Sequence, residues 1–255
     1  SGEPLMAARF GATEIKAILY PYLPKIMKIF LKKRFLNRMF ILSGFFPSNE
    51  ENIIKFSNLS INDIKDLDIL GSWRIEEFFF KKELHNVNIV KLEHFEPYLN
   101  NEPWSQSLKN KKVLVIHPFA ETIIEQYKKK DLLFLNKKIL PNFKLEVIKA
   151  VQSLSGENKQ FNDWFQALDF MKNQISKKDF DIALIGCGAY GFPLAAHVKR
   201  LGKQAIHMGG SLQILFGIKG KRWDNHPIIS ELYNEHWVRP LKQDKPSKSN
   251  LVEND

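Results

Sequence analysis

The residue pattern with the clearest chemical meaning is a glycine-rich segment that follows a short apolar run. Gly186, Gly188 and Gly191 have the spacing G-x-G-x-x-G and precede a helical pattern. In such a turn the first glycine permits a tight bend, the second lets a phosphate approach the backbone, and the third lets helix and strand pack closely. The free N–H groups and dipole of the following helix favour an anion. We therefore expect a nucleotide or phosphate to bind here, with Tyr190 in the site; the alternative is a turn that serves packing alone.

The next apolar run argues against a nicotinamide dinucleotide. Recognition of the NAD ribose needs an Asp or Glu about 20 residues after the glycines, at the end of the next strand. That run ends instead as Ile206-His207-Met208-Gly209-Gly210, without an acid. We expect no NAD, while nucleotide or sugar-phosphate binding remains open.

A second glycine turn, Gly209-Gly210, opens the segment that ends at Trp223. Its backbone amides could face a ligand, Lys219 and Arg222 could neutralise a diphosphate, and Trp223 could cover a ring. The alternative is a solvated basic turn with one buried tryptophan. The same candidate binding set includes His207 and Gln213.

Two further candidates follow other apolar runs. Arg9 and Glu14 lie on either side of Gly11, just after Pro4–Ala8. Glu14 could ligate a metal, act as a base or stabilise a helix N-terminus, and Arg9 could bind phosphate or orient Glu14. His117 could be a general base, although a hydrogen-bonded structural histidine is the alternative.

Other catalytic patterns are missing from the sequence. Cys187 is the single cysteine, which fits a reducing compartment and excludes an internal disulfide. We interpret it as a small residue packed beneath the glycine turn. There is no paired-cysteine or HExxH zinc motif, no G-x-S-x-G elbow and no G-x-x-x-x-G-K-[ST] loop.

The elements that position these residues alternate between strand and helix. The expected strands are Pro4–Ala8, Val113–Ile116, Phe143–Val151, Phe180–Ile185 and Gln204–Met208. The expected helices run from Glu14 past Lys33, through Tyr127 to Lys130, and over Phe161–Lys177 and Phe192–Leu201. This alternation predicts βαβ units, and so an α/β, Rossmann-like fold with a mostly parallel sheet flanked by helices.

Length and composition favour one domain. The chain has 255 residues, of which 44% are hydrophobic and 26% charged, as in ordinary globular proteins. We expect a single α/β domain over residues 1–240, a helical and aromatic insertion at about 49–104, and a disordered tail at 241–255. The sequence contains no run of about 18 apolar residues, so we expect no membrane-spanning helix.

The charge is strongly basic and unevenly distributed. Lysine and arginine number 38 against 28 acids, a net charge of +10, which suggests an anionic partner. Tyr20–Phe46 carries six basic residues and no acid. We favour a core helix with a solvated basic face, and peripheral membrane contact is the alternative. No nucleic-acid-binding motif accompanies the charge, so we expect no nucleic-acid partner.

Two segments together resemble a known family. Arg9-Phe10-Gly11-Ala12-Thr13-Glu14 and the run from Ile182 to Gly210, with Lys199, Gly202, Ala205 and Ile206, resemble the GT-D-type glycosyltransferase domain. The chain also resembles uncharacterised proteins from bacterial surface-polysaccharide gene clusters. The matching segments are Val113–Tyr127, Gly186–Trp223 and Trp237–Pro240.

The resemblance implies a GT-D-like fold and a cytoplasmic glycosyltransferase, which could lie at the inner face of the membrane. The implied donor is a nucleotide sugar and the acceptor a glycan or lipid-linked glycan, with Glu14, His117 and Arg9 as catalytic candidates. The family turn carries D-x-E, linked to Mn²⁺ or Mg²⁺; Glu14 matches the glutamate, while Ala12 replaces the aspartate. Transfer of another phosphorylated group to a glycan, or a non-catalytic nucleotide- or glycan-binding subunit, are the alternatives.

Overall fold

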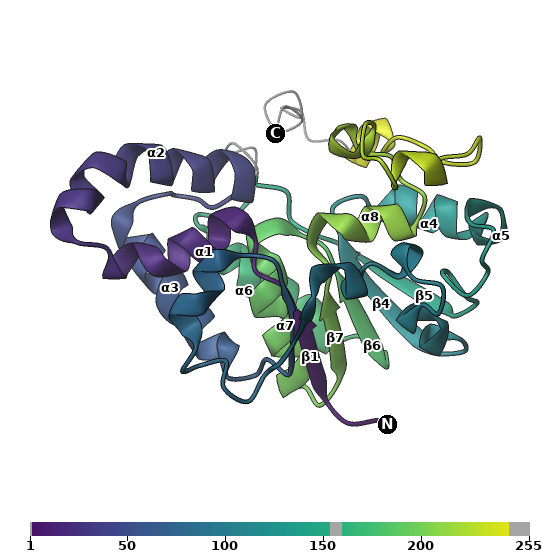
Figure 1. The fold of residues 1–255 in the computed structure, drawn as a ribbon, viewed down its shortest axis with the longest axis horizontal. Helices are drawn as coiled ribbons and strands as arrows, with labels where there is room; N and C mark the ends of the chain where they lie inside the picture. Colours follow the sequence, from purple (N-terminus) through teal and green to yellow (C-terminus); the bar gives the residue numbers. More distant parts are fainter. Residues whose placement is uncertain (1, 154–159, 245–255) are drawn as a thin grey trace.

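A computed structural model describes residues 2–153 and 160–244, and its centre is one parallel sheet. Seven strands of the described chain form this sheet in the order β3-β2-β1-β7-β6-β4-β5, and every pair of neighbours is parallel. The strands are β1 (Leu5–Ala8), β2 (Ile69–Ser72), β3 (Asn88–Lys91), β4 (Lys112–His117), β5 (Lys144–Lys149), β6 (Ile182–Ile185) and β7 (Gln204–His207). Because all strands run the same way, their carboxyl ends lie along one edge of the sheet (Figure 1).

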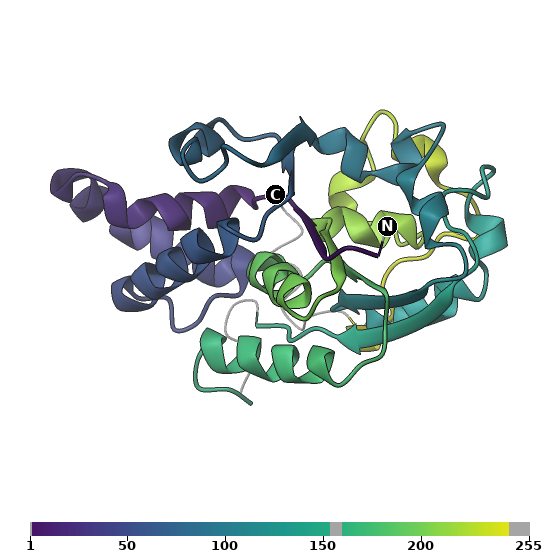
Figure 2. The same cartoon turned by 90° about the horizontal axis from the view of Figure 1, so that it is seen from below.

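Helices cover both faces of this sheet (Figure 2). The α-helices are α1 (Ala12–Leu19), α2 (Lys25–Ser43), α3 (Glu50–Ile64), α4 (Ala120–Tyr127), α5 (Lys130–Leu133), α6 (Trp164–Ser176), α7 (Gly191–Arg200) and α8 (Leu212–Leu215). Short 3₁₀ helices are η1 (Tyr20–Tyr22), η2 (Ile75–Phe80), η3 (Leu92–Phe95), η4 (Pro97–Leu99), η5 (Trp104–Leu108), η7 (Gly188–Tyr190), η8 (Gly209–Ser211), η9 (Lys221–Trp223), η10 (Ser230–Leu232) and η11 (Lys242–Asp244).

The side chains of β4 show how one strand serves two cores. Leu114 and Ile116 pack on one face, in the core that contains residues of α1, α3, α6 and α7. Val113 and Val115 pack on the other face, with residues of α4, α5 and α8. A strand buried on both sides reads as a continuous apolar run, which is why β4 stands out in the sequence. The three layers confirm the α/β, Rossmann-like prediction.

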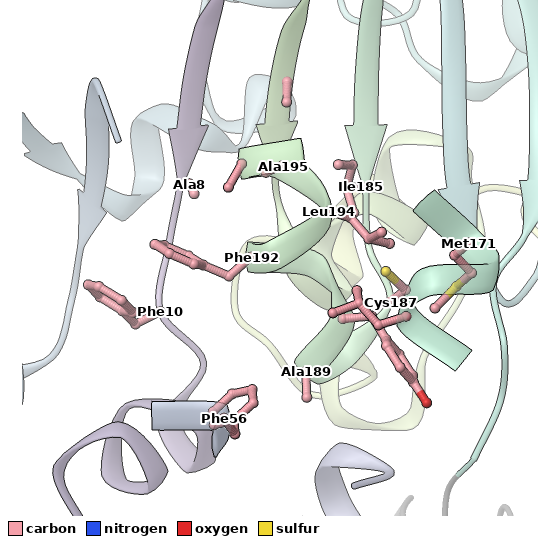
Figure 3. Close-up of a cluster of buried hydrophobic side chains, with 14 of the residues drawn as sticks. Ala8, Phe10, Phe56, Met171, Ile185, Cys187, Ala189, Phe192, Leu194 and Ala195 are labelled. Atoms are coloured by element: carbon pink, nitrogen blue, oxygen red, sulfur yellow. The ribbon is translucent and has the colours of Figure 1, made fainter. Parts of the chain in front are cut away.

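The first core reaches up to the glycine turn after β6. Phe10 and Phe192 stack there, with ring centroids 4.9 Å apart and planes inclined by 19°. Cys187 is buried, and Figure 3 shows it among Ile185, Leu194 and Met171. Burial raises the pKa of its thiol. Its position beneath the turn is the one that the sequence suggested.

The prediction of one helix from Glu14 past Lys33 is wrong. The chain forms α1, turns through η1, and starts α2 after Pro24. Pro21 and Pro24 lack the N–H groups that a continuous helix would need, and Pro24 suits the position before a helix. The two helices therefore form a hairpin that projects from the sheet (Figure 1).

The segment 49–104 is more than an insertion, because it completes the sheet. It supplies the helix α3 and the strands β2 and β3. The side chain of Asn49 caps the N-terminus of α3, where it accepts a hydrogen bond from the Asn52 N–H at 2.9 Å. The first residues of the predicted tail, 241–244, are ordered. In η11 the Asp244 carboxylate is buried and accepts from the Thr122 N–H and hydroxyl at 2.8 and 2.7 Å, while residues 245–255 lie outside the described part.

Candidate functional site

A cavity of about 410 Å³ opens at the carboxyl edge of the sheet, between β1 and β7. The chain leaves β1 for α1 on one face and leaves β7 for α8 on the other face. Ligands of parallel α/β sheets bind at such points, where neighbouring strands lead to opposite faces. Its charged and polar lining is Arg9, Thr13, Glu14, Ser43, Ser60, Glu96, His207, Ser211 and Arg222.

At the end of β1, Gly11 allows Glu14 to fold back over the strand. A Cβ at Gly11 would lie 1.8 Å from Oε2 of Glu14, so any side chain there would displace the carboxylate. Both residues line the cavity together with Arg9 and Ala12. The R-F-G-x-x-E segment thus brings an arginine and a carboxylate to the same opening.

At the end of β7, two arginine side chains lie against Gly209 and Gly210, and at Gly210 the absence of a Cβ makes room for one of them. A Cβ at Gly209 would lie 3.7 Å from Cδ of Arg9, and one at Gly210 would lie 1.9 Å from Nη2 of Arg222. Gly209 also has a φ of 65°, which favours glycine. The turn therefore carries one arginine from β1 and one from η9 over consecutive residues.

Neither of these arginines forms a direct ion pair with a residue that the structure describes. Within the described residues, no carboxylate forms an ion pair or hydrogen bond with the guanidinium of Arg9 or Arg222. Each lies over an indole instead: Arg9 is 4.3 Å from the ring centre of Trp73, and Arg222 is 3.8 Å from that of Trp223. Such stacking holds a guanidinium in place without using its hydrogen-bond donors.

The protein around the two cations lowers the pKa of both. Burial is the main cause for Arg9, partly offset by Glu14 and Glu96. The side chain of Arg222 is open to the solvent in the cavity, yet protein surrounds it on its other sides. Burial and the nearby charge of Arg9 lower its pKa to about 10, so that it is still charged at neutral pH. The pair is a concentrated positive charge at the mouth of a concave site.

Two buried polar groups of the lining also lack partners. His207 makes no hydrogen bond of normal geometry through either ring nitrogen, and Ser43 makes none through its hydroxyl. Burial lowers the pKa of His207 to about 3, and the positive charge of Arg9 adds to this shift. The backbone of Arg9 acts in the opposite direction and raises the pKa. Unpaired buried polar atoms are uncommon in folded proteins and call for an explanation such as a bound ligand or water.

One side of the cavity is lined mainly by apolar residues. It lies between α1, the end of α2, α3 and the start of α7, and its side chains are Phe10, Ile18, Leu42, Phe56, Ala189 and Phe192. An anionic group at the arginines could therefore continue into a less polar part.

Nine of the predicted site residues line this cavity. They are Arg9, Gly11, Glu14, Gly188, His207, Gly209, Gly210, Arg222 and Trp223. The two sequence signals at the ends of β1 and β7, far apart in the chain, therefore form one site.

Most of the glycine turn after β6 serves packing instead of the cavity. A Cβ at Gly186 would lie 2.5 Å from the Gly209 carbonyl oxygen, and one at Gly191 would lie 2.1 Å from Nε2 of His207. Tyr190 stacks on Trp164, with ring centroids 4.9 Å apart. The start of α7 is thus covered by its neighbours, and the packing alternative describes these three residues best.

Three other predicted residues also lie outside the lining. His117 is buried and accepts from the Phe119 N–H at 2.9 Å, and burial lowers its pKa to about 3, so it is neutral. Gln213 donates to the Ile218 carbonyl at 3.1 Å. The Lys219 ammonium lies 5.3 Å from the ring centre of Tyr233. For His117 the structural alternative holds.

Sequence reasoning missed Trp73 and Glu96 as parts of the site. Trp73 donates from its indole N–H to the Phe10 carbonyl at 2.8 Å, which fixes the ring beside Arg9. Burial raises the pKa of Glu96, and both arginines oppose this shift. The aromatic segment at 73–80 was a visible signal, whereas nothing near Glu96 marked it.

The donor set does not fit a protein-held metal ion. Across residues 2–153 and 160–244, no three His, Cys, Asp or Glu side chains lie close enough together to hold one. Ala12 also lines the cavity, and its methyl group supplies no ligand. We therefore assign no step to a metal.

Comparisons with models of known protein families, with curated proteins and with solved structures found no match.

Proposed function

We propose that the chain is a glycosyltransferase-like enzyme whose cavity binds a nucleotide-activated sugar. The observation that carries this proposal is the pair Arg9 and Arg222, which form no direct ion pair with another described residue and lie over the Gly209-Gly210 turn. Planar guanidinium groups bind phosphate oxygens through paired hydrogen bonds. Two guanidinium groups that lie side by side over Gly209 and Gly210 suit the two phosphates of a diphosphate better than the single anionic group of a carboxylate.

The same arrangement supports transfer chemistry. As the bond between the anomeric carbon and the diphosphate breaks, its electron pair goes to the phosphate oxygen, and the arginines stabilise that growing charge. The acceptor oxygen forms the new bond to the anomeric carbon. Glu14, which lines the same cavity, takes the proton from the acceptor hydroxyl as general base.

A binding assay tests the diphosphate site. We would titrate purified protein with UDP, GDP and dTDP, with and without Mn²⁺, by calorimetry and by thermal unfolding. A ligand at 100 times its Kd adds about 2.7 kcal/mol of stability, or roughly 5–10 °C in Tm for a chain of this size. No binding of any nucleoside diphosphate by folded protein would refute the proposal.

Three variants sharpen the assay. Arg222→Met removes one set of charged hydrogen bonds and should weaken binding about 10- to 100-fold. Gly210→Ala keeps the charge, but its methyl group would lie 1.9 Å from Nη2 and must push the guanidinium away, so binding should also weaken. Arg34→Met, which removes an exposed arginine of α2, is the matched control and should bind like the wild type.

A non-catalytic nucleotide- or glycan-binding subunit is the second candidate, because Ala12 stands where the family has its aspartate. The two functions differ in turnover. Sugar transfer by pure protein that disappears in Glu14→Gln, with binding retained, supports the enzyme. Binding without turnover for any donor supports the subunit. A product mass that shows a phosphorylated group added to the glycan would identify the remaining alternative.

A further inference from the structure

The surface least explained by the fold is the N-terminal half of α2. Its large apolar side chains are exposed to solvent: the exposed fraction is 60% for Ile26, 64% for Ile29 and 76% for Phe30. Tyr22, just before the helix, is exposed to 65%. Clusters of exposed large apolar residues usually mark an interaction site.

These apolar residues lie in line with cations on the same helix. Ile26, Phe30, Arg34 and Arg38 follow one another at intervals of four, which places them in one row along the helix. The opposite side of α2 packs on the core, where the rings of Phe35 and Tyr20 stack at 4.9 Å. The exposed row is therefore apolar at the start of the helix and basic further along.

Most of the cations of this helix are free. From Lys25 to Ser43 there are six basic residues and no acid. Lys32 pairs with Glu50 at 2.6 Å, and Lys28 donates to the Pro21 carbonyl at 2.6 Å. The other four, Lys25, Lys33, Arg34 and Arg38, form no ion pair with any residue that the structure describes.

The position of the helix leaves this row accessible. The hairpin of α1 and α2 projects from the sheet, and its turn forms one end of the molecule (Figure 1). No helix in residues 2–153 and 160–244 is long and apolar enough to cross a bilayer. Contact with a membrane through α2 would therefore be contact with its surface.

We propose that the tip of this hairpin docks on an anionic lipid bilayer, with Ile26 and Phe30 inserted among the acyl chains and the cations against the headgroups. Charge complementarity selects this partner. A second copy of the chain would bring the same cations together, since a twofold interface pairs like surfaces. A nucleic acid would use the cations and leave the exposed apolar side chains unused. Surface-bound helices combine an apolar row with lysine and arginine in this way.

Vesicle binding tests the proposal independently of any sugar transfer. The full chain would be sedimented with vesicles of phosphatidylcholine alone and with vesicles containing 30% phosphatidylglycerol, at low and at physiological salt. We expect binding to the anionic vesicles that weakens with salt. Lack of binding to anionic vesicles at low salt would overturn the proposal.

Two triple variants with the same net charge separate a local surface from overall charge. Lys33→Gln, Arg34→Gln and Arg38→Gln together should reduce vesicle affinity on the order of 100-fold, because each cation near an anionic surface contributes about fivefold. The control combines three substitutions at exposed lysines elsewhere, Lys109→Gln, Lys129→Gln and Lys177→Gln. An equal loss in both triple variants would overturn the proposal.

The apolar part has its own test. Ile26→Ser with Phe30→Ser should reduce affinity roughly tenfold or more, whereas Leu135→Ser with Ile228→Ser, at exposed positions elsewhere, should not. Unchanged vesicle binding in the first pair would show recognition of charge alone and overturn insertion. Sedimentation equilibrium excludes the remaining case: a dimer that Phe30→Ser dissociates would assign the surface to a second copy.

Discussion

The buried histidine of the cavity makes the stability of the protein depend on pH in a calculable way. His207 lies between β7 and the start of α7, and its surroundings lower its pKa to about 3, mainly through burial and then through Arg9. An unfolded histidine has a pKa of about 6.5. Between these two values the unfolded chain binds a proton that the folded chain does not, so stability falls as the pH falls below 6.5.

The size of the effect follows from the two pKa values. At pH 5 the unfolded histidine is almost fully protonated, while about 1% of the folded molecules carry the proton. The linkage relation gives a loss of about 2 kcal/mol between pH 7 and pH 5 for this one group. His207→Gln keeps a polar side chain of similar size and cannot titrate. Its free energy of unfolding should therefore fall by about 2 kcal/mol less than that of the wild type over the same range.

Urea unfolding followed by tryptophan fluorescence at pH 7, 6 and 5 measures this difference. Groups shared by both proteins, His117 among them, cancel in the comparison. His94→Gln, at an exposed position, controls for the loss of a histidine as such. Parallel losses in the wild type and His207→Gln would mean that the folded protein does not hold His207 neutral, and the electrostatics derived for the cavity would be wrong.

Three further predictions concern other parts of the fold and site. Gly11→Ala should lower turnover, because its methyl group would displace the Glu14 carboxylate, and it should change Tm little, because the end of that side chain is flexible. Activity equal to that of the wild type would contradict a role for the Glu14 position. Asp244→Ala should lower the free energy of unfolding by about 1–3 kcal/mol, since the two hydrogen bonds from Thr122 are lost, and urea titration that shows no change would place η11 outside the cooperative fold. The buried thiol of Cys187, whose pKa burial raises, should react with a thiol reagent only as the protein unfolds; rapid labelling of native protein at pH 8 would contradict its position.

The strands at the centre of the sheet could be predicted because their sequences carry the mark of burial on both faces. β4 and β6 contain short runs of buried apolar residues, and a glycine or histidine at the end of each leads on towards a helix. β7 is more polar, and the Gly209-Gly210 turn after it made it recognisable. The edge strand β3 could not be predicted in this way, since most of its residues are exposed and Asn88 and Lys91 are polar. β2 contains Gly71, which lowers its apparent strand propensity.

Several single residues of the site could be predicted from the sequence, but their arrangement in space could not. Arg9 and Arg222 each stand beside glycines at the end of a recognisable element, so their chemistry could be inferred locally. That they meet over one turn depends on β1 lying next to β7, a pairing between opposite ends of the chain that no local pattern contains. Trp73 and Glu96 follow β2 and β3, and their place in the site could not be inferred without these strands.

Several locally unfavourable features lie around the cavity. A left-handed glycine, two cations without direct ion pairs, a histidine and a serine without partners, and an acid folded over a glycine all lie around one cavity. Single features of these kinds also occur elsewhere, such as the positive φ of Gly217 and the unpartnered buried hydroxyl of Tyr20. The cavity differs because it combines them with two cations in a concave site. Proteins keep locally unfavourable arrangements chiefly where function requires them. An anion at Arg9 and Arg222 would satisfy the cations that the fold leaves unpaired, which is why we take this cavity, and not the better-known pattern at Gly186–Gly191, as the centre of function.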